Sequence, residues 1–232
     1  TIGESRYQMG IGGRHSTESN RAVHADDDHY LEDDDVGSFY PAIILNSGLY
    51  PKALGPAFLT EFRKVRDERI AAKKVDKVKA EGLKTALNGA GFGKLGSPYS
   101  VLYAPHLLIT ITLTGQSALL MLIERAELAG IPVVSANTDG VVFRCRRDQE
   151  SILEAVKTKW MQDTGFDLEA TRYKSLYNQS VNSYIAVKED GTAKLKGPLA
   201  NPWRSDGPWK PDLRAQLMKN PQMPILTNAV VD

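Results

Sequence analysis

The sequence has few of the features that mark several large classes of protein. It contains one cysteine, Cys145, in 232 residues, which excludes an internal disulfide framework and a cysteine-based zinc site. We find no apolar run that we expect to span a bilayer, no signal peptide, no polybasic tail, no internal repeat and no Walker phosphate-binding pattern. These absences predict an ordinary globular protein with no membrane partner.

The formal net charge of +1 is an average over two opposed segments. Between Asp26 and Asp35, ten residues include seven acids, and between Arg63 and Lys84, 22 residues include nine bases. A near-neutral chain is not typical of a nucleic-acid-binding protein, but this segregation suits a protein that handles a metal ion and a polyanion together. A solvated acidic loop followed by a solvated helix is the alternative, and it is the commoner explanation of a single charged run.

Hydrophobic periodicity and turn residues predict alternating strands and helices. Gly130 and Gly165 are typical of helix ends, and the Asp-Gly pair at 139–140 is typical of a hairpin turn. Gly89, Gly91, Gly93 and Gly96 predict a flexible loop. The predicted strands are 30–39, 131–136, 141–145, 166–173, 181–188 and 192–196. The predicted helices are 59–74, a second one ending at 88 after a break at 75–76, 116–128 and 148–163.

With the two charged helices set aside as an insertion, the order of elements predicts an α+β fold, a ferredoxin-like (split βαβ) sheet with helices on one face. Many unrelated proteins use this sheet, so it does not by itself give a function. It does place the first strand, which carries Asp35, beside the hairpin that carries Asp139. We therefore expect two carboxylates to meet at one edge of the sheet and to bind a divalent metal ion.

Magnesium suits this arrangement because it prefers oxygen ligands and needs few carboxylates when substrate phosphates complete its shell. Two such ions can activate a hydroxyl and stabilise a leaving pyrophosphate. Phosphoryl transfer also requires charge neutralisation, which the basic helices would supply. Arg69 and Lys73 are four residues apart on one helix face, as are Lys84 and Asn88.

Three segments resemble the polymerase motifs of family B DNA polymerases, in that family's order. Residues 35–41 (DVGSFYP) resemble the first motif, an Asp followed by Ser-Leu-Tyr-Pro, and residues 84–89 (KTALNG) resemble the second, Lys-x3-Asn-Ser-x-Tyr-Gly. Residues 137–140 (NTDG) resemble the third, Asp-Thr-Asp-Ser. Residues 11–13 (IGG) and 181–184 (VNSY) lie where the family has its Tyr-x-Gly-Gly and primer-contacting elements, and 112–116 (TLTGQ) is most similar to bacteriophage members. Three ordered motifs are a strong signal where each alone is weak.

The resemblance implies a role for each matching residue. Asp35 and Asp139 are implied to be the catalytic, metal-binding carboxylates, with the Val36 carbonyl as a further ligand. Tyr40 is implied to stack under the sugar and exclude a 2′-hydroxyl. The residues implied to bind the incoming nucleotide are Ser38, Phe39, Tyr40, Arg69, Lys73, Lys84 and Asn88. The residues implied to contact DNA are Gly12, Gly13, Thr138, Asn182, Tyr184, Lys194 and Lys196.

Three departures from the family pattern are visible. Asn137 replaces the first Asp of the third motif, which leaves one negative charge fewer, although Asp139 matches the principal ligand. The second motif holds one extra residue before its aromatic-Gly pair, Phe92-Gly93. The primer-contacting element lacks its basic residues and keeps Asn182 and Tyr184.

Each assignment has a plainer alternative. Asp139 could be an ordinary turn residue, because Asp-Gly is common in hairpins. Asp35 could belong to a solvated acidic run, and Arg69 and Lys73 to a solvated helix face. Asp33 shares the face of Asp35 by strand alternation and could support it. Tyr40 could be a core aromatic.

Together the residues and the resemblance predict a template-directed DNA polymerase of phage replication that extends a primer 3′-hydroxyl with dNTPs. Two Mg²⁺ ions, or Mn²⁺, are the implied cofactors, and primer-template DNA, dNTPs and a separate exonuclease or processivity protein are the implied partners. A cytoplasmic location follows, in the host cell if the chain is phage-encoded. A non-catalytic nucleic-acid-binding domain and an untemplated nucleotidyltransferase remain the alternatives. The expected division is palm at 1–58 and 99–200, fingers at 59–98, and a loop with the start of a thumb at 201–232.

Overall fold

The computed structural model describes residues 1–197, so the predicted loop and thumb segment at 201–232 lies outside the described residues. The chain forms a mixed α/β fold around a curled antiparallel sheet. The strands are β1 Tyr7–Gly10, β2 Gly13–Ser16, β3 Ser19–His24, β4 His29–Val36, β5 Val133–Ala136, β6 Gly140–Arg146, β7 Leu168–Ser180, β8 Ser183–Lys188 and β9 Ala193–Lys196. The helices are α1 Phe39–Asn46, α2 Ala57–Ala72, α3 Lys77–Thr85, the π-helix η1 Ala86–Phe92, the 3₁₀ helices η2 Gly93–Gly96 and η3 Arg147–Gln149, α4 Pro105–Leu128 and α5 Glu150–Thr164.

The main sheet has strand order β5-β6-β4-β7-β8-β9, with β3 also paired to β7. β4 is central and pairs antiparallel with both β6 and β7. β7 is long enough to pair with β4 through its first half and with β3 and β8 through its second. A separate two-stranded ribbon, β1-β2, lies outside this sheet.

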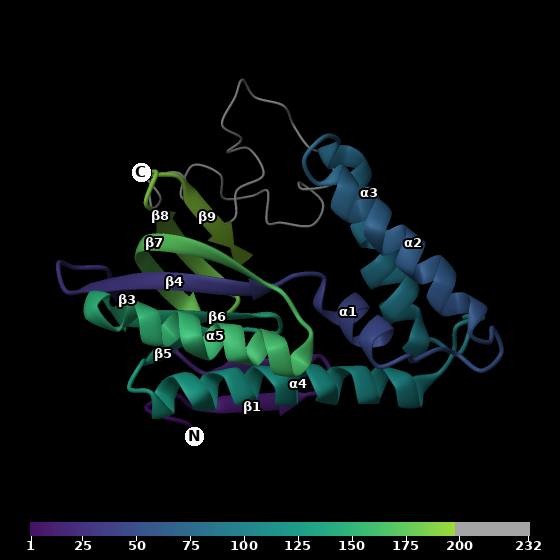
Figure 1. Ribbon diagram of the computed structural model, residues 1–232, viewed down its shortest axis with the longest axis horizontal. Coiled ribbons are helices and arrows are strands. Elements are labelled where there is room, and N and C mark those ends of the chain that lie inside the picture. Colours follow the sequence, from purple (N-terminus) through teal and green to yellow (C-terminus); the bar gives the residue numbers. More distant parts are fainter. Residues whose placement is uncertain (198–232) are drawn as a thin grey trace.

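Alternate residues of β4 face two different cores, as the period of a strand requires. Tyr30 and Val36 belong to the larger core on the helix side, whereas Leu31 belongs to a smaller core on the opposite face with Tyr173 and Tyr184. Figure 1 shows α4 and α5 lying together below the sheet, while α2 and α3 stand away from it beyond the end of β4. The end of β4 therefore opens toward the α2–α3 hairpin.

Helix α4 is longer than the predicted 116–128 helix and corrects a second expectation. It has 24 residues and is long and apolar enough, by length and composition alone, to cross a membrane, so the expectation that no such run exists was wrong. Its charged residues, Glu124, Arg125 and Glu127, lie among its last five residues, so the rest of the helix contains no Asp, Glu, Lys or Arg. In this fold Ile111, Leu119 and Ile123 of α4 are fully buried in the larger core, and core helices pass the same length and composition test.

Two further differences from the prediction bear on the site. The 30–39 strand ends at Val36, because Gly37 and Ser38 turn the chain, Ser38 with a positive φ of 51°, and α1 begins at Phe39. The predicted glycine loop is helical instead, forming the π-helix η1 and then η2. Close packing explains the glycine at position 91, since a Cβ there would lie 2.6 Å from the ring of Phe62.

The helix-facing side of β4 carries a buried group of charges. The Lys157 ammonium of α5 lies 2.5 Å from Glu32 and 3.2 Å from Asp34, and it also pairs with Glu154. Glu32 accepts a second ion pair from Arg172 of β7 at 2.6 Å. Among residues 1–197, neither oxygen of Asp34 has a hydrogen-bond partner of normal geometry, and burial raises the pKa of Asp34 to about 7 despite the neighbouring ammonium. Lys157 thus ties α5 to the central strand.

We expect Lys157→Met to destabilise the fold by about 3–5 kcal/mol, because it leaves the buried Asp34 carboxylate without its cation and removes one of the two cations paired with Glu32. Urea unfolding followed by circular dichroism measures the change. Lys159→Met on the same helix is the matched control, since Lys159 pairs with Asp163 at the surface and is 65% exposed. Its loss should cost at most about 1 kcal/mol. Equal costs for the two variants would contradict the structural role of the buried pair.

Candidate active site

The end of β4 and the β5–β6 turn lie side by side. Asp35 is opposite Gly140 in the β4–β6 register, and the Val36 amide donates a hydrogen bond to the Asp139 carbonyl at 2.7 Å. The two predicted carboxylates therefore come from neighbouring backbone segments, as the strand order inferred from the sequence required.

Asn137 builds the turn that presents Asp139. Its side-chain oxygen accepts hydrogen bonds from the amides of Asp139 at 3.0 Å and Gly140 at 2.7 Å. A Cβ at position 140 would meet the Asp35 carboxylate, so a larger residue there would have to displace that side chain. The Asp35 side chain thus lies directly over the backbone of the turn.

Negative charge is concentrated around Asp35. Burial, the largest cause, and the nearby carboxylates of Asp33 and Asp139 together raise its pKa to about 6. The ammonium of Lys194 opposes this effect from 3.0 Å to Asp33 and 3.3 Å to Asp35. Asp33 is buried and also accepts a hydrogen bond from the Tyr173 hydroxyl at 2.5 Å.

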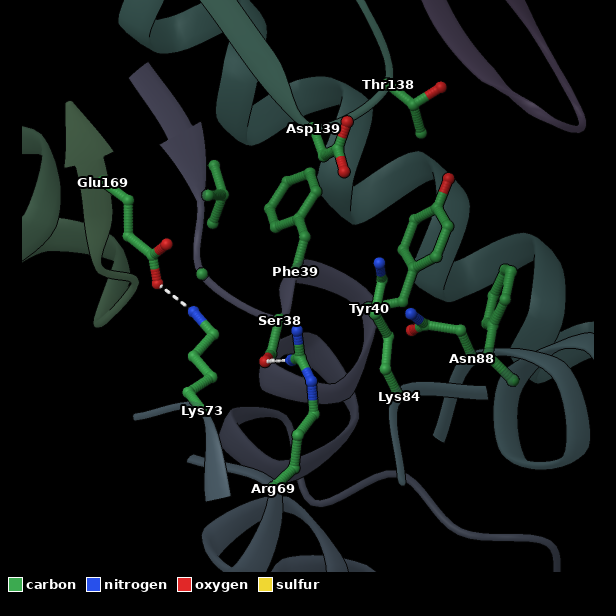
Figure 2. A pocket seen from close by; sticks show the side chains of 13 residues that line it. Ser38, Phe39, Tyr40, Arg69, Lys73, Lys84, Asn88, Thr138, Asp139 and Glu169 are labelled. Carbon is green, nitrogen blue, oxygen red and sulfur yellow. Dashed lines mark hydrogen bonds and ion pairs between the residues drawn. The ribbon is translucent and has the colours of Figure 1, made fainter. Parts of the chain in front are cut away.

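A cavity of about 370 Å³ opens between the end of β4, the turn and the α2–α3 hairpin. Figure 2 shows Asp139 and Thr138 on one side of it and the side chains of Arg69, Lys73 and Lys84 on the other. All seven residues predicted to bind a nucleotide line this cavity, whereas Asp35 does not line it and lies one residue before Val36, which does. The full lining is Val36, Gly37, Ser38, Phe39, Tyr40, Arg69, Lys73, Lys84, Asn88, Phe92, Thr138, Asp139 and Glu169.

The three cations of the cavity each have a partner within the protein. Lys73 pairs with Glu169 of β7 at 2.5 Å, across the cavity from α2 (Figure 2). Arg69 donates to the Ser38 hydroxyl, and Lys84 pairs with Glu81 one turn earlier. An anionic ligand would therefore compete with carboxylates for Lys73 and Lys84.

Aromatic residues form one wall of the cavity. The rings of Tyr40 and Phe92 stack at a centroid distance of 4.1 Å, and the Tyr40 hydroxyl donates to the Gly12 carbonyl at 3.4 Å. Phe92 reaches this position because the π-helix, with hydrogen bonds from i to i+5, takes one more residue into a turn than an α-helix does. The wider turn lies between Asn88 and Phe92, where the resemblance implies one extra residue.

The residues predicted to contact DNA lie in different surroundings in the structure. Gly13, with φ 141°, brings the β1–β2 turn against Thr138, since a Cβ at Gly13 would lie 2.8 Å from the Thr138 hydroxyl. Tyr184 is buried in the smaller core, with the Lys196 ammonium 5.8 Å from its ring centroid. Asn182 is exposed in the turn before β8. Lys194 is held by Asp33 and Asp35.

Sequence reasoning did not find Glu169, which lines the cavity and pairs with Lys73. Its only signal was its place in the predicted 166–173 strand, which the expected sheet puts beside the 30–39 strand, and no motif marks Glu169 as the partner of Lys73. Asp33 was named as a possible supporting residue from strand alternation, and it does share the face of Asp35. Lys194 reaches that face of β4 because the sheet curls, and the sequence did not predict this curvature.

The donor set fits a hard divalent cation. Within residues 1–197 no three His, Cys, Asp or Glu side chains form a metal-binding cluster. Magnesium needs only one or two carboxylates when phosphate oxygens supply the other ligands, however. Asp35 and Asp139 give all-oxygen donors on adjacent segments, in a place where burial and the carboxylates of Asp33 and Asp139 raise the pKa of Asp35. A divalent cation would relieve that repulsion.

Comparison with known proteins extends the description of the fold. No protein-family model and no curated protein matches the sequence. Among solved structures, the family B DNA polymerase from the hyperthermophilic archaeon Pyrobaculum calidifontis matches with a TM-score of 0.52 and 17% sequence identity. The match covers 86% of this chain and 31% of that polymerase. The described chain is thus similar in fold to under a third of a family B DNA polymerase.

Proposed function

We propose that this chain is the palm and fingers of a template-directed DNA polymerase of family B type that extends a primer 3′-hydroxyl with dNTPs. One observation carries the proposal: Asp139, Tyr40 and three cations converge on one cavity, at the end of the strand that bears Asp35. The fold likeness to a family B polymerase supports it independently. The similarity of 112–116 to phage members supports a role in phage DNA replication.

The strand order supports a ferredoxin-like palm. The succession β4, α4, β5, β6, α5, β7 gives the spatial order β5-β6-β4-β7, with every neighbouring pair antiparallel. This is the arrangement of a split βαβ sheet. In this scheme α2 and α3 are the fingers, inserted between the first strand and the first helix of the palm.

The carboxylates of Asp35 and Asp139 and the Val36 carbonyl would hold Mg²⁺. When bound, the ions supply activation of the primer hydroxyl and stabilisation of the leaving pyrophosphate. Arg69, Lys73 and Lys84 would bind the triphosphate and neutralise its charge, which is most of what phosphoryl transfer requires of a protein. For Lys73 this means exchanging Glu169 for a phosphate oxygen.

The Tyr40–Phe92 stack would form the floor under the sugar. Tyr40 is fixed by its ring contact with Phe92 and by its hydroxyl contact with Gly12, so it has little freedom to move aside for an additional hydroxyl group. This supports discrimination against ribonucleotides by steric exclusion. Phe92 would contribute by packing against the Tyr40 ring and holding it in place.

Two other functions are alternatives, and a specific observation favours the first of them. A non-catalytic nucleic-acid-binding domain, or a decayed polymerase, is favoured by Asn137, which gives the turn one carboxylate fewer. An untemplated nucleotidyltransferase would use the same metal and triphosphate chemistry without reading a template. Primer extension separates all three.

We expect the intact protein to extend a primed template in Mg²⁺, adding only the complementary nucleotide. Asp35→Asn and Asp139→Asn should each reduce the rate by more than about hundredfold, because loss of a residue that merely supports a metal ligand already costs 10–100-fold. Asp148→Asn is the matched control, an exposed carboxylate just beyond the opposite end of β6. No extension by the folded protein would favour the binding domain, and addition that ignores the template would favour the transferase.

We expect Tyr40→Ala to admit ribonucleotides. The ratio of kcat/KM for dNTP over rNTP should fall by at least about tenfold, the effect of enlarging a tightly packed pocket. Single-nucleotide incorporation kinetics measure it. Tyr177→Ala, at a partly exposed tyrosine on β7, is the control and should leave the ratio unchanged. An unaltered ratio in a Tyr40→Ala enzyme that still extends with dNTPs would remove Tyr40 from this role.

A further inference from the structure

The carboxylates of Asp33 and Asp35 share one face of β4 with a single ammonium group between them. Residues two apart on a strand point to the same side, so these two like charges are neighbours. Lys194 of β9 lies 3.0 Å from Asp33 and 3.3 Å from Asp35. The pair and the lysine form a compact group that we call the Lys194 clamp, consisting of Asp33, Asp35 and Lys194.

The clamp depends on the curl of the sheet. β9 is separated from β4 by β7 and β8, and three strand spacings of about 4.8 Å in a flat sheet would exceed the reach of a lysine side chain. The β8–β9 hairpin pairs with the second half of β7, whereas β4 pairs with the first half. The curl brings β9 over the face that bears Asp35, so the contact is a product of the fold.

The two carboxylates of the clamp are held unequally. Asp33 has a side-chain exposure of 6% and accepts a hydrogen bond from Tyr173 in addition to the ion pair. Asp35 has an exposure of 42%, and its only ion pair within residues 1–197 is the longer one to Lys194. Asp33 is therefore the fixed anchor of the ammonium, and Asp35 is the carboxylate open to exchange.

We propose that Lys194 is a resident counter-cation of Asp35, which a divalent ion must displace from that carboxylate in order to bind. The inference rests on the proposed metal site and adds a residue that controls its affinity. The ammonium and a divalent ion repel each other and use the same Asp35 oxygens, so they compete. Lys194 stays attached to Asp33 when it leaves Asp35, which makes it a positioning residue.

Binding of Mn²⁺ alone, measured by electron paramagnetic resonance without DNA or nucleotide, tests the competition directly. Lys194→Met should tighten binding by about five- to tenfold, a modest coupling between two cation sites. Lys194→Arg keeps a cation at the clamp and should bind nearly as the wild type does. Lys196→Met is the matched control, because Lys196 lies two residues further along β9 and contacts the ring of Tyr184 instead.

Asp33 provides a test in the opposite direction. Asp33→Asn removes the anchor and leaves the ammonium to Asp35 alone, so Mn²⁺ binding should weaken. The double variant Asp33→Asn with Lys194→Met leaves no buried carboxylate unpaired, and it carries the test if Lys194→Met alone does not fold. It should bind Mn²⁺ more tightly than Asp33→Asn.

The outcomes separate this inference from the proposed function. If Asp35→Asn abolishes Mn²⁺ binding while the Lys194 variants bind as the wild type does, the counter-cation role is wrong and the metal site stands. If Lys194→Met lowers only the affinity for DNA, Lys194 is a backbone contact and the inference is likewise overturned. If Asp35→Asn leaves Mn²⁺ binding unchanged, the metal site itself is wrong.

Discussion

The compensation of negative charge on β4 is the constraint on which the rest of the site depends. Four consecutive acids alternate between its faces, and a carboxylate can be buried only beside a cation that replaces its lost hydration. Lys157 from α5 serves the helix side, through Glu32 and Asp34, and Lys194 from β9 serves the open side. Each cation comes from an element distant in sequence, so the carboxylates of β4 gain their cationic partners only when the whole fold is assembled.

This compensation explains why the site can be both strongly acidic and well ordered. The buried pairs fix β4, the central strand of the sheet, against α5. The Val36 amide of β4 then holds the hairpin turn that carries Asp139. Chemistry is left to the strand end, where Asp35 is half exposed and the cavity begins. The buried carboxylates of β4 therefore keep the strand rigid, while the neighbouring Asp35 remains free to exchange its ion-pair partner.

The sequence predicted those parts of the structure that local pattern controls. The two hairpins, the glycine-ended helices and the meeting of Asp35 with the Asp139 turn follow from periodicity, turn residues and strand order. It did not predict Glu169 opposite Lys73 or Lys194 at Asp35, because both contacts depend on how β7 and β9 curve in space. The glycine segment was mispredicted because glycine, which usually favours turns, here permits close helix packing against Phe62.

The π-helix η1 has a consequence for how such a site tolerates change in chain length. A single inserted residue in an α-helix would rotate every following side chain by about 100°, because each turn holds about 3.6 residues. A wider turn confines that rotation to itself, so Lys84 before it and Phe92 at its end still face one cavity. Counting residues from a motif would misplace the aromatic by one position, whereas the stacked ring on Tyr40 identifies it. Insertion can thus alter the spacing of a motif while leaving its spatial arrangement intact.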